Sequence, residues 1–323
     1  MKSLSRYCVF AIAAAIGLIV SPAIAADGFP SRAVRIIVPF TPGGSADTSA
    51  RILATKLTEI WRQPVIVESK PGGGTTIASA YVAQAAPDGY TLYLAYGLSY
   101  ATSASLYKNL SYDPKTSLAP VSMVADAPFI LSVPQGSSVG NVADLIEQGK
   151  SGSLMYASTG IGAGPHLTTE SFLRRSGIKA LHVPYKGTAG AMTSLMANEV
   201  QFSVFDAAAL GNLRGGKIRP IAVTSAKRWA ILPEVPTIAE SGFPGFDITS
   251  GSYILVPGQV PKDIVAQLNT AIVKALASPD VEKQFAALGF TAISSTPEKL
   301  RQTMTKDMER LSVLIDTLGL TAN

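Results

Sequence analysis

The stretch VRIIVPFTPGGSADT, residues 34–48, joins a run of β-branched residues to a Pro-Gly-Gly turn and the start of a helix. Apolar residues then recur at near-helical spacing, at Ala46, Ala50, Leu53, Leu57 and Ile60. A strand that leads through a Gly-rich turn into a helix aims several backbone N–H groups at one point, where an anion is favoured. The stretch therefore predicts an anion-binding loop.

The N-terminus has the three parts of a secretory signal peptide. Lys2 and Arg6 form a basic region, residues 9–20 are an unbroken apolar run, and Ala23-Ile24-Ala25 is a small-residue cleavage site. We therefore expect residues 1–25 to be removed on secretion. The mature chain would then act in the periplasm.

Composition and charge argue against several classes of function. The formal charge of +5 falls to +3 without the two basic residues of the signal, and the remaining basic pairs are isolated, so we expect no nucleic-acid partner. The single cysteine, Cys8, lies in the signal, which leaves no disulfide or thiol chemistry in the mature chain. The mature histidines and carboxylates show no metal-ligand spacing, so we expect no metal and no other cofactor.

Short β-rich runs alternate with helical runs along the mature chain, which is typical of βαβ units and parallel sheets. The chain could cross between two domains at Asp126-Ala127-Pro128 and again at residues 225–228. We expect an α/β fold with a first domain of residues 26–125 plus 227–323 and a second of residues 126–226. Each would hold a mostly parallel sheet flanked by helices, with the ligand cleft between the facing strand ends.

The individual elements follow from the same patterns. The expected strands are residues 34–40, 65–68, 91–95, 118–124, 130–133, 154–157, 181–183, 202–205, 221–223 and 254–256. The expected helices are residues 47–61, 76–85, 142–149, 166–176, 189–198, 207–211, 237–241, 262–277, 280–288 and 297–317.

Four Gly-rich turns precede helices, at residues 42–45, 71–76, 158–166 and 185–190. Pro165 fits the first position of a helix, and Ser45 and Thr188 are candidate N-caps. Each turn alone could be a tight connection in which glycine supplies a positive φ. Two or more turns converging from both domains would instead form a site.

Enzyme motifs are absent or weak in this sequence. No P-loop is present, and Gly160-x-Gly162-x-Gly164 is not a dinucleotide fingerprint. GSSVG, residues 136–140, formally matches a nucleophile elbow, but VPQ precedes it and Asn141 follows, which favours a loop before a helix. A hydrolase would also need His166 or His182 as its general base. We favour the loop interpretation and assign no catalytic residue.

Three polar residues near these turns are open to more than one interpretation. His182 lies between apolar residues of a strand and is interpreted as structural, whereas His166 opens a helix beside the third Gly-rich turn and is a candidate for ligand contact. Asp206 ends an apolar strand, so it would face the cleft. It could accept a hydrogen bond from the ligand or cap the following helix.

Several motifs together carry a family resemblance. They are FPSRAVRIIVPFTPGGSAD (29–47), QPVIVESKPGGG (63–74), APDGYTL (86–92), GPHL (164–167), VPYKG (183–187), PEVPT (233–237) and ESGFPGF (240–246). In this order they resemble the substrate-binding proteins of tripartite tricarboxylate transporters, the Bug family of periplasmic receptors. The resemblance covers nearly the whole mature chain.

The resemblance implies a type II-like two-domain periplasmic binding protein that closes on a small carboxylate and delivers it to membrane transporter subunits. The ligand would be a di- or tricarboxylate, an acidic amino acid or an aromatic carboxylate, and the receptor a monomer. Presenting the ligand to a two-component sensor is an alternative role, and a secreted α/β hydrolase is a distant one. Candidate ligand contacts are Phe40, Thr41, Pro42, Gly43, Gly44, Ser45, Ala46, Asp47, Tyr96, Ser158, Thr159, Gly164, His166, Lys186, Gly187, Thr188 and Asp206.

Overall fold

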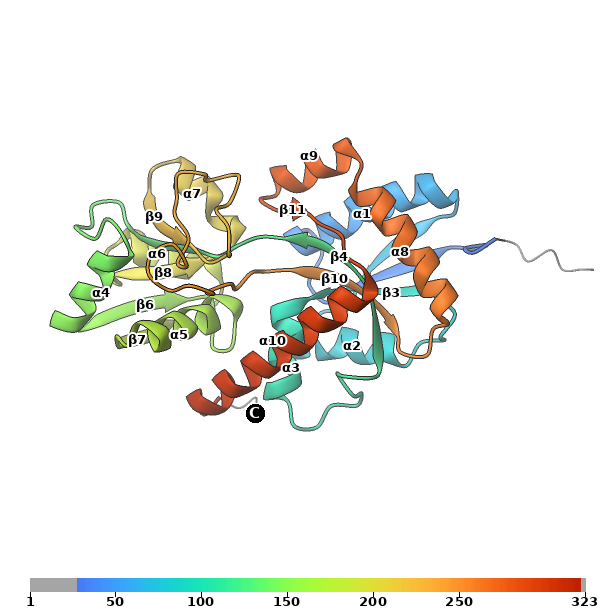
Figure 1. The fold of residues 1–323 in the computed structure, drawn as a ribbon, viewed down its shortest axis with the longest axis horizontal. Helices are drawn as coiled ribbons and strands as arrows, with labels where there is room; N and C mark the ends of the chain where they lie inside the picture. The colour runs from blue at the N-terminus through green and yellow to red at the C-terminus, as the bar shows by residue number, and fades with distance from the viewer. Residues whose placement is uncertain (1–27, 321–323) are drawn as a thin grey trace, which may run out of the picture.

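Two β-sheets, each with its own helices, organise the chain (Figure 1). The computed structural model describes residues 28–320. The expected signal peptide, residues 1–25, lies outside the described residues and stays a prediction. We call the larger sheet with its helices the first lobe and the smaller sheet with its helices the second lobe.

The first lobe is built on a six-stranded sheet in the order β11-β4-β10-β3-β1-β2. Its strands are β1 (Val34–Val38), β2 (Val65–Ser69), β3 (Thr91–Tyr96), β4 (Leu118–Asp126), β10 (Ser252–Pro257) and β11 (Thr291–Ala292). Its helices are α1 (Ser45–Trp61), η1 (Gly73–Thr75), α2 (Thr76–Ala83), α3 (Gly97–Leu106), α8 (Lys262–Leu276) and α9 (Pro279–Ala287).

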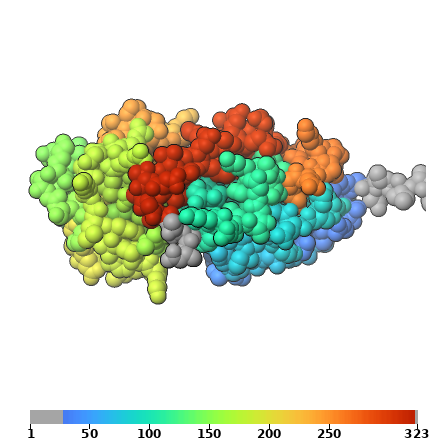
Figure 2. All heavy atoms as spheres, turned by 90° about the horizontal axis from the view of Figure 1, so that it is seen from below, coloured from blue at the N-terminus to red at the C-terminus, as the bar shows by residue number. Residues whose placement is uncertain are grey.

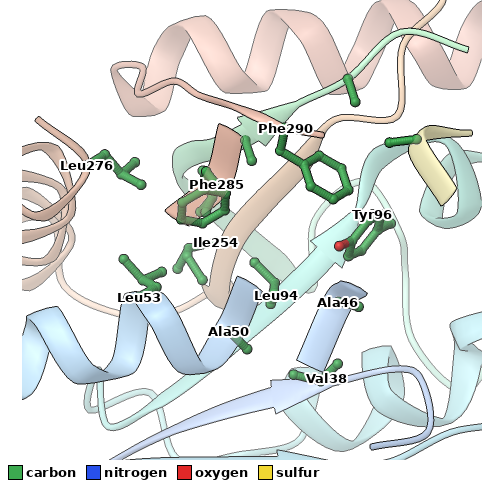
Figure 3. Packing of buried hydrophobic residues seen from close by; sticks show 14 of the residues in the cluster. Val38, Ala46, Ala50, Leu53, Leu94, Tyr96, Ile254, Leu276, Phe285 and Phe290 are labelled. Carbon is green, nitrogen blue, oxygen red and sulfur yellow. The ribbon is translucent and has the colours of Figure 1, made fainter. Parts of the chain in front are cut away.

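Helices cover both faces of this sheet, which explains why β3, near its centre, is buried throughout. Alternate residues of a strand point to opposite faces. In β3, Leu92 and Leu94 pack in one hydrophobic cluster with residues of α1, α8 and α9, whereas Tyr93 and Ala95 pack in another with residues of α2. Figure 3 shows the first of these clusters, with Leu94 near Ala50 of α1 and Ile254 of β10.

The second lobe is built on a five-stranded sheet in the order β7-β6-β8-β5-β9. Its strands are β5 (Ile130–Pro134), β6 (Leu154–Ser158), β7 (Ala180–Pro184), β8 (Phe202–Phe205) and β9 (Ile218–Val223). Its helices are α4 (Val142–Ser151), α5 (Gly164–Ser176), α6 (Thr188–Met196), η2 (Ala207–Ala209) and α7 (Leu210–Arg214).

The expectation of mostly parallel sheets is wrong, because both sheets are mixed. β1 pairs in parallel with β2 and β3, and β6 with β7 and β8. The remaining pairs, which involve β4, β5, β9, β10 and β11, are antiparallel. Among these are the strands through which the chain leaves one lobe and enters the other.

The two crossings of the chain lie side by side, since Pro128 forms an antiparallel bridge with Thr249 (Figure 1). Before the second crossing, residues 236–248 remain attached to β9. Ile238 N donates to Val223 O at 2.9 Å, and Ile248 N donates to Thr224 O at 3.0 Å. The domain limits stay a prediction, but these bonds favour a second crossing near Thr249 rather than at residue 226.

The last helix, α10 (Pro297–Leu318), joins the lobes. Near its N-terminus, Leu300 and Met304 belong to a cluster of the first lobe. Near its C-terminus, Leu311, Leu314 and Ile315 belong to the cluster that contains the core of the second lobe. Figure 1 shows the helix running diagonally from one lobe toward the other, and Figure 2 shows it lying along both from below.

One expected helix is absent, and one helix was not expected. Residues 237–241 form turns and no helix: Thr237 and Glu240 exchange cap-like hydrogen bonds of 2.7 and 2.9 Å, but Gly242 then turns the chain with φ +104°. In contrast, α3 was not expected, because its small residues show no helical periodicity. None of the helices in residues 28–320 has the length and apolar character of a membrane span.

Candidate functional site

A cavity of about 430 Å³ lies between the lobes. Phe40 after β1 and Tyr96 at the end of β3 line it from the first lobe, and Thr159 after β6 and Asp206 after β8 line it from the second. It therefore lies at the carboxyl ends of strands from both sheets, the usual ligand position in open α/β folds.

The structure brings together part of the expected site. The candidates that line the cavity are Phe40, Thr41, Gly44, Ser45, Ala46, Tyr96, Thr159, Gly164 and Asp206. Those that do not line it are Pro42, Gly43, Asp47, Ser158, His166, Lys186, Gly187 and Thr188. Residues that sequence reasoning did not select also line it: Leu98, Ser99, Ala127, Phe129, Ala163, Pro165, Ala207, Ala208, Ser250, Leu288 and Phe290.

Helix α1 begins at the wall of the cavity. Its N-cap is Gly44, in an extended conformation, and Ser45 is the first helical residue, so the expectation that Ser45 is the cap is wrong. The first hydrogen bond of the helix runs from Thr48 N to Gly44 O. The N–H groups before Thr48 have no partner within the helix. Those of Gly44, Ser45 and Ala46 belong to residues that line the cavity.

Asp47 holds this turn from behind. Its Oδ2 accepts hydrogen bonds from Gly43 N at 3.1 Å and from Arg51 Nε at 2.9 Å, and the residue is buried. Arg51 and then the Gly43 N–H lower the pKa of the Asp47 carboxyl, so it is ionised at neutral pH. Gly43 adopts φ +88°, which favours glycine. Asp47 thus positions the loop and does not line the cavity.

Aromatic rings form much of the apolar wall. The rings of Phe40 and Tyr96 meet edge to face with centroids 5.4 Å apart. Figure 3 shows Tyr96 beside Phe290. The Tyr96 hydroxyl is buried and has no hydrogen-bond partner among residues 28–320. Burial raises the pKa of this phenol, and the negative charge of Asp206 adds to the effect.

Asp206 caps the short helix that follows β8. Its Oδ1 accepts a hydrogen bond from Ala208 N at 3.1 Å, which is the capping role considered from sequence. Burial raises the pKa of this carboxyl. At the fourth Gly-rich turn, Gly187 is the N-cap of α6 with φ +93° and Thr188 is the first helical residue, so the expected Thr188 cap is wrong.

A stack of rings supports the third Gly-rich turn. His166 is buried, and its Nδ1 accepts a hydrogen bond from Gly162 N at 3.0 Å. The rings of His166 and His182 stack with centroids 4.1 Å apart, and Tyr156 stacks on His182 at 4.8 Å. Ser158 Oγ lies 2.6 Å from His182 Nε2. His166 and Ser158 therefore shape the loop from beneath the cavity.

The cavity has the chemistry of a binding site. No lysine or arginine is among the described residues that line it, and its donors are backbone N–H groups and hydroxyls. Within residues 28–320, no three histidine, cysteine or acidic side chains gather as metal ligands would. The GSSVG motif forms the loop before α4, where Asn141 Oδ1 accepts from Asp144 N at 3.0 Å as a helix cap.

A second cavity, of about 400 Å³, lies at residues of β1, α2 and the start of β3. Arg32, Arg35 and Asp88 line it, and Arg32 and Asp88 form an exposed ion pair of 2.7 Å. It is not formed by loops of both lobes. The cleft between the lobes is therefore the better candidate for a ligand site.

Comparison with known proteins identifies relatives over nearly the whole chain. Residues 49–320 match the family model described as the tripartite tricarboxylate transporter family receptor. Protein BugT of Bordetella pertussis is 34% identical over 315 residues, which cover 95% of this chain and 97% of BugT.

Solved structures agree with this match. The periplasmic binding protein BugD is 33% identical with a TM-score of 0.74, covering 91% of this chain and 100% of that one. R. palustris Rpa4515 with adipate is 34% identical with a TM-score of 0.77, covering 91% and 99%. The fold is thus that of two-domain periplasmic binding proteins, and the chain belongs to the tripartite tricarboxylate transporter receptor family, as a substrate-binding protein of the Bug type.

Proposed function

We propose that this protein is a non-catalytic periplasmic receptor that captures a small carboxylate in the cleft and delivers it to a membrane transporter. Family membership and the adipate in a related structure support the proposal. The proposal also includes secretion by residues 1–25, two domains, and action as a monomer.

The observation that carries the proposal is the start of α1 in the cavity wall. A carboxylate there accepts hydrogen bonds from N–H groups that the helix leaves unpaired, and the helix dipole favours its charge. Charge-assisted hydrogen bonds of this kind contribute about 1.5–3 kcal/mol each. A small anion can therefore be held without an arginine, provided that both lobes enclose it and exclude water.

The test removes one of these N–H groups and leaves the helix intact. In Ser45→Pro the ring occupies the first helical position, where proline is well tolerated, and Gly44 is already extended, as the residue before a proline prefers. The matched control, Ser45→Ala, removes the hydroxyl and keeps the N–H. Isothermal titration should show a loss of at least tenfold in carboxylate affinity for Ser45→Pro, about 1.4 kcal/mol, and a smaller loss for Ser45→Ala.

The titration uses a carboxylate found by a thermal-shift screen of the parent protein. A ligand at about 100 times its Kd should stabilise the fold by about 2.7 kcal/mol. Circular dichroism and the melting temperature check that Ser45→Pro folds. If folded Ser45→Pro binds the carboxylate as tightly as Ser45→Ala, the anion is held elsewhere and the proposed site is wrong.

A further inference from the structure

The charge of the cavity is unusual for a site that receives anions. Asp206 is the only charged side chain among the described residues that line it. A negative charge in the wall disfavours a second negative charge on a ligand, because like charges repel more strongly in a partly enclosed site than in bulk water. The wall therefore distinguishes between the two ends of a ligand.

One carboxylate oxygen of Asp206 can accept a hydrogen bond that no described residue donates. Its Oδ1 is engaged by Ala208 N, whereas Oδ2 accepts no hydrogen bond from any residue in the described range 28–320. No ion pair with a described lysine or arginine neutralises the group. Asp206 is partly buried, so a ligand that supplies a donor to Oδ2 replaces water there with a charge-assisted hydrogen bond.

The hydroxyl of Tyr96 is a second polar group in the part of the cavity lined by Asp206. It is buried, it has no hydrogen-bond partner in the described part of the chain, and its residue lines the same cavity as Asp206. Tyr96 is 9% exposed. Burial raises the pKa of this phenol, and the hydroxyls of Ser49 and Ser45 lie close enough to oppose that shift, so Tyr96 adds a polar group at this end of the cavity without requiring a ligand atom as its partner.

The second lobe offers fewer free N–H groups for a carboxylate than the first. At the start of α5, Pro165 has no N–H. The N–H groups of Gly162 and Ala163 are already donated to His166 and Gly160, which leaves that of Gly164 at the cavity wall. The rest of the wall is largely apolar, with the rings of Phe40, Phe129 and Phe290. One anionic group, one donor group and an apolar body fit these surroundings.

We propose that the ligand is an aminocarboxylate, with one carboxylate held at the start of α1 and a protonated amine held by Asp206, and not a dicarboxylate. The inference rests on the proposed function for its carboxylate end. It assigns Asp206 as the residue that selects between amine and carboxylate at the other end.

The test compares probes that differ only in the group offered to Asp206. The pairs are leucine with 4-methylpentanoate, and 6-aminohexanoate with hexanoate, and adipate serves as the dicarboxylate of the second pair. Isothermal titration of the parent should show at least one aminocarboxylate binding tenfold or more tightly than its partner without the amine, and more tightly than adipate.

Two variants then locate the selection. Asp206→Asn keeps an oxygen for the Ala208 N–H, and Asp206→Ser keeps a capping hydroxyl, so both should fold. Both variants should lose the tenfold preference for the aminocarboxylate. Their affinity for the matched carboxylate that lacks the amine should stay as in the parent. Asp316→Asn, an exposed position in α10, makes the same change of charge away from the cavity and should bind as the parent does.

The outcomes separate the two proposals. If adipate binds the parent best and Asp206→Asn leaves the order of affinities unchanged, the assignment of Asp206 is overturned and the carboxylate receptor stands. The assignment is also overturned if the amine preference persists in both variants. If neither the aminocarboxylates nor the other carboxylates bind the parent, the proposed function itself fails.

Discussion

At the scale of single residues, His166 shows how a buried side chain can shape the cavity without lining it. Its Nδ1 is an acceptor for Gly162 N, so the ring must be neutral at that nitrogen. Protonation of His166 at Nδ1 would place one N–H donor against another, that of Gly162. Burial, with a smaller contribution from His182, lowers the pKa of His166 to about 4.

The first residue-scale prediction concerns acid stability. Because the folded pKa of His166 lies below the ordinary value of 6.5, the stability that the neutral ring contributes is fully present above pH 6.5 and is lost as the pH falls toward 4. The slope can approach about 1.4 kcal/mol per pH unit. In His166→Asn, an amide oxygen keeps the acceptor and does not titrate. Urea unfolding from pH 7.5 to 4.5 should therefore show a steeper loss for the parent.

Asn also removes the ring stacking, so the comparison concerns slopes and not absolute stabilities. His182, whose pKa burial also lowers, contributes to the slope of both proteins. Parallel profiles for parent and variant would mean that His166 titrates alike in the folded and unfolded states.

The Gly-rich loop at residues 42–47 could be predicted from sequence, but the role of each residue in it could not. Pattern alone indicated a strand, a turn and a helix start. Only the backbone shows that Gly43 has the positive φ and Gly44 does not, and that Asp47 turns back to hold Gly43. Phe290 gave no signal, because its approach to the cavity depends on the packing of distant elements.

At the scale of elements, periodicity was informative wherever one face of a helix is apolar, as in α1. It failed for α3, whose small residues pack on several sides, and for residues 237–241, where a capping pattern is cut short by Gly242. Sheet direction was also missed, because apolar runs such as β5 and β10 look alike whether their neighbours run parallel or antiparallel.

The element-scale prediction concerns the C-terminal half of α10. Leu314 is buried in the cluster that includes the core of the second lobe, whereas the adjacent Val313 is 57% exposed. Leu314→Ala should lower the free energy of unfolding by about 2–4 kcal/mol, and Val313→Ala by less than about 0.5 kcal/mol. Denaturant unfolding of both variants measures the difference. Equal effects would show that this part of α10 contributes no buried contact in solution.

At the scale of the whole molecule, the two lobes share hydrophobic contacts. One cluster contains Leu94 of the first sheet and Phe205 of the second, and α10 adds residues to clusters of both lobes. Separate sheets would permit separate unfolding, but shared clusters couple their stabilities.

The whole-molecule prediction is that the protein without ligand unfolds in one transition. Calorimetry should give one peak whose calorimetric and van't Hoff enthalpies agree. Near-ultraviolet and far-ultraviolet circular dichroism should follow the same curve. Two peaks, or curves that do not coincide, would show that each lobe is stable without the other.

The position of α10 at the end of the chain also has a consequence for biosynthesis. Leu300 and Met304 belong to one cluster and Leu311, Leu314 and Ile315 to another, so neither is whole until α10 has been made. A nascent chain that lacks them leaves apolar surface of both lobes open to water and cannot reach the native packing early. The native packing of both lobes thus depends on residues of α10 that are distant in sequence from most of their partners, so we expect both lobes to be incompletely packed until α10 is available.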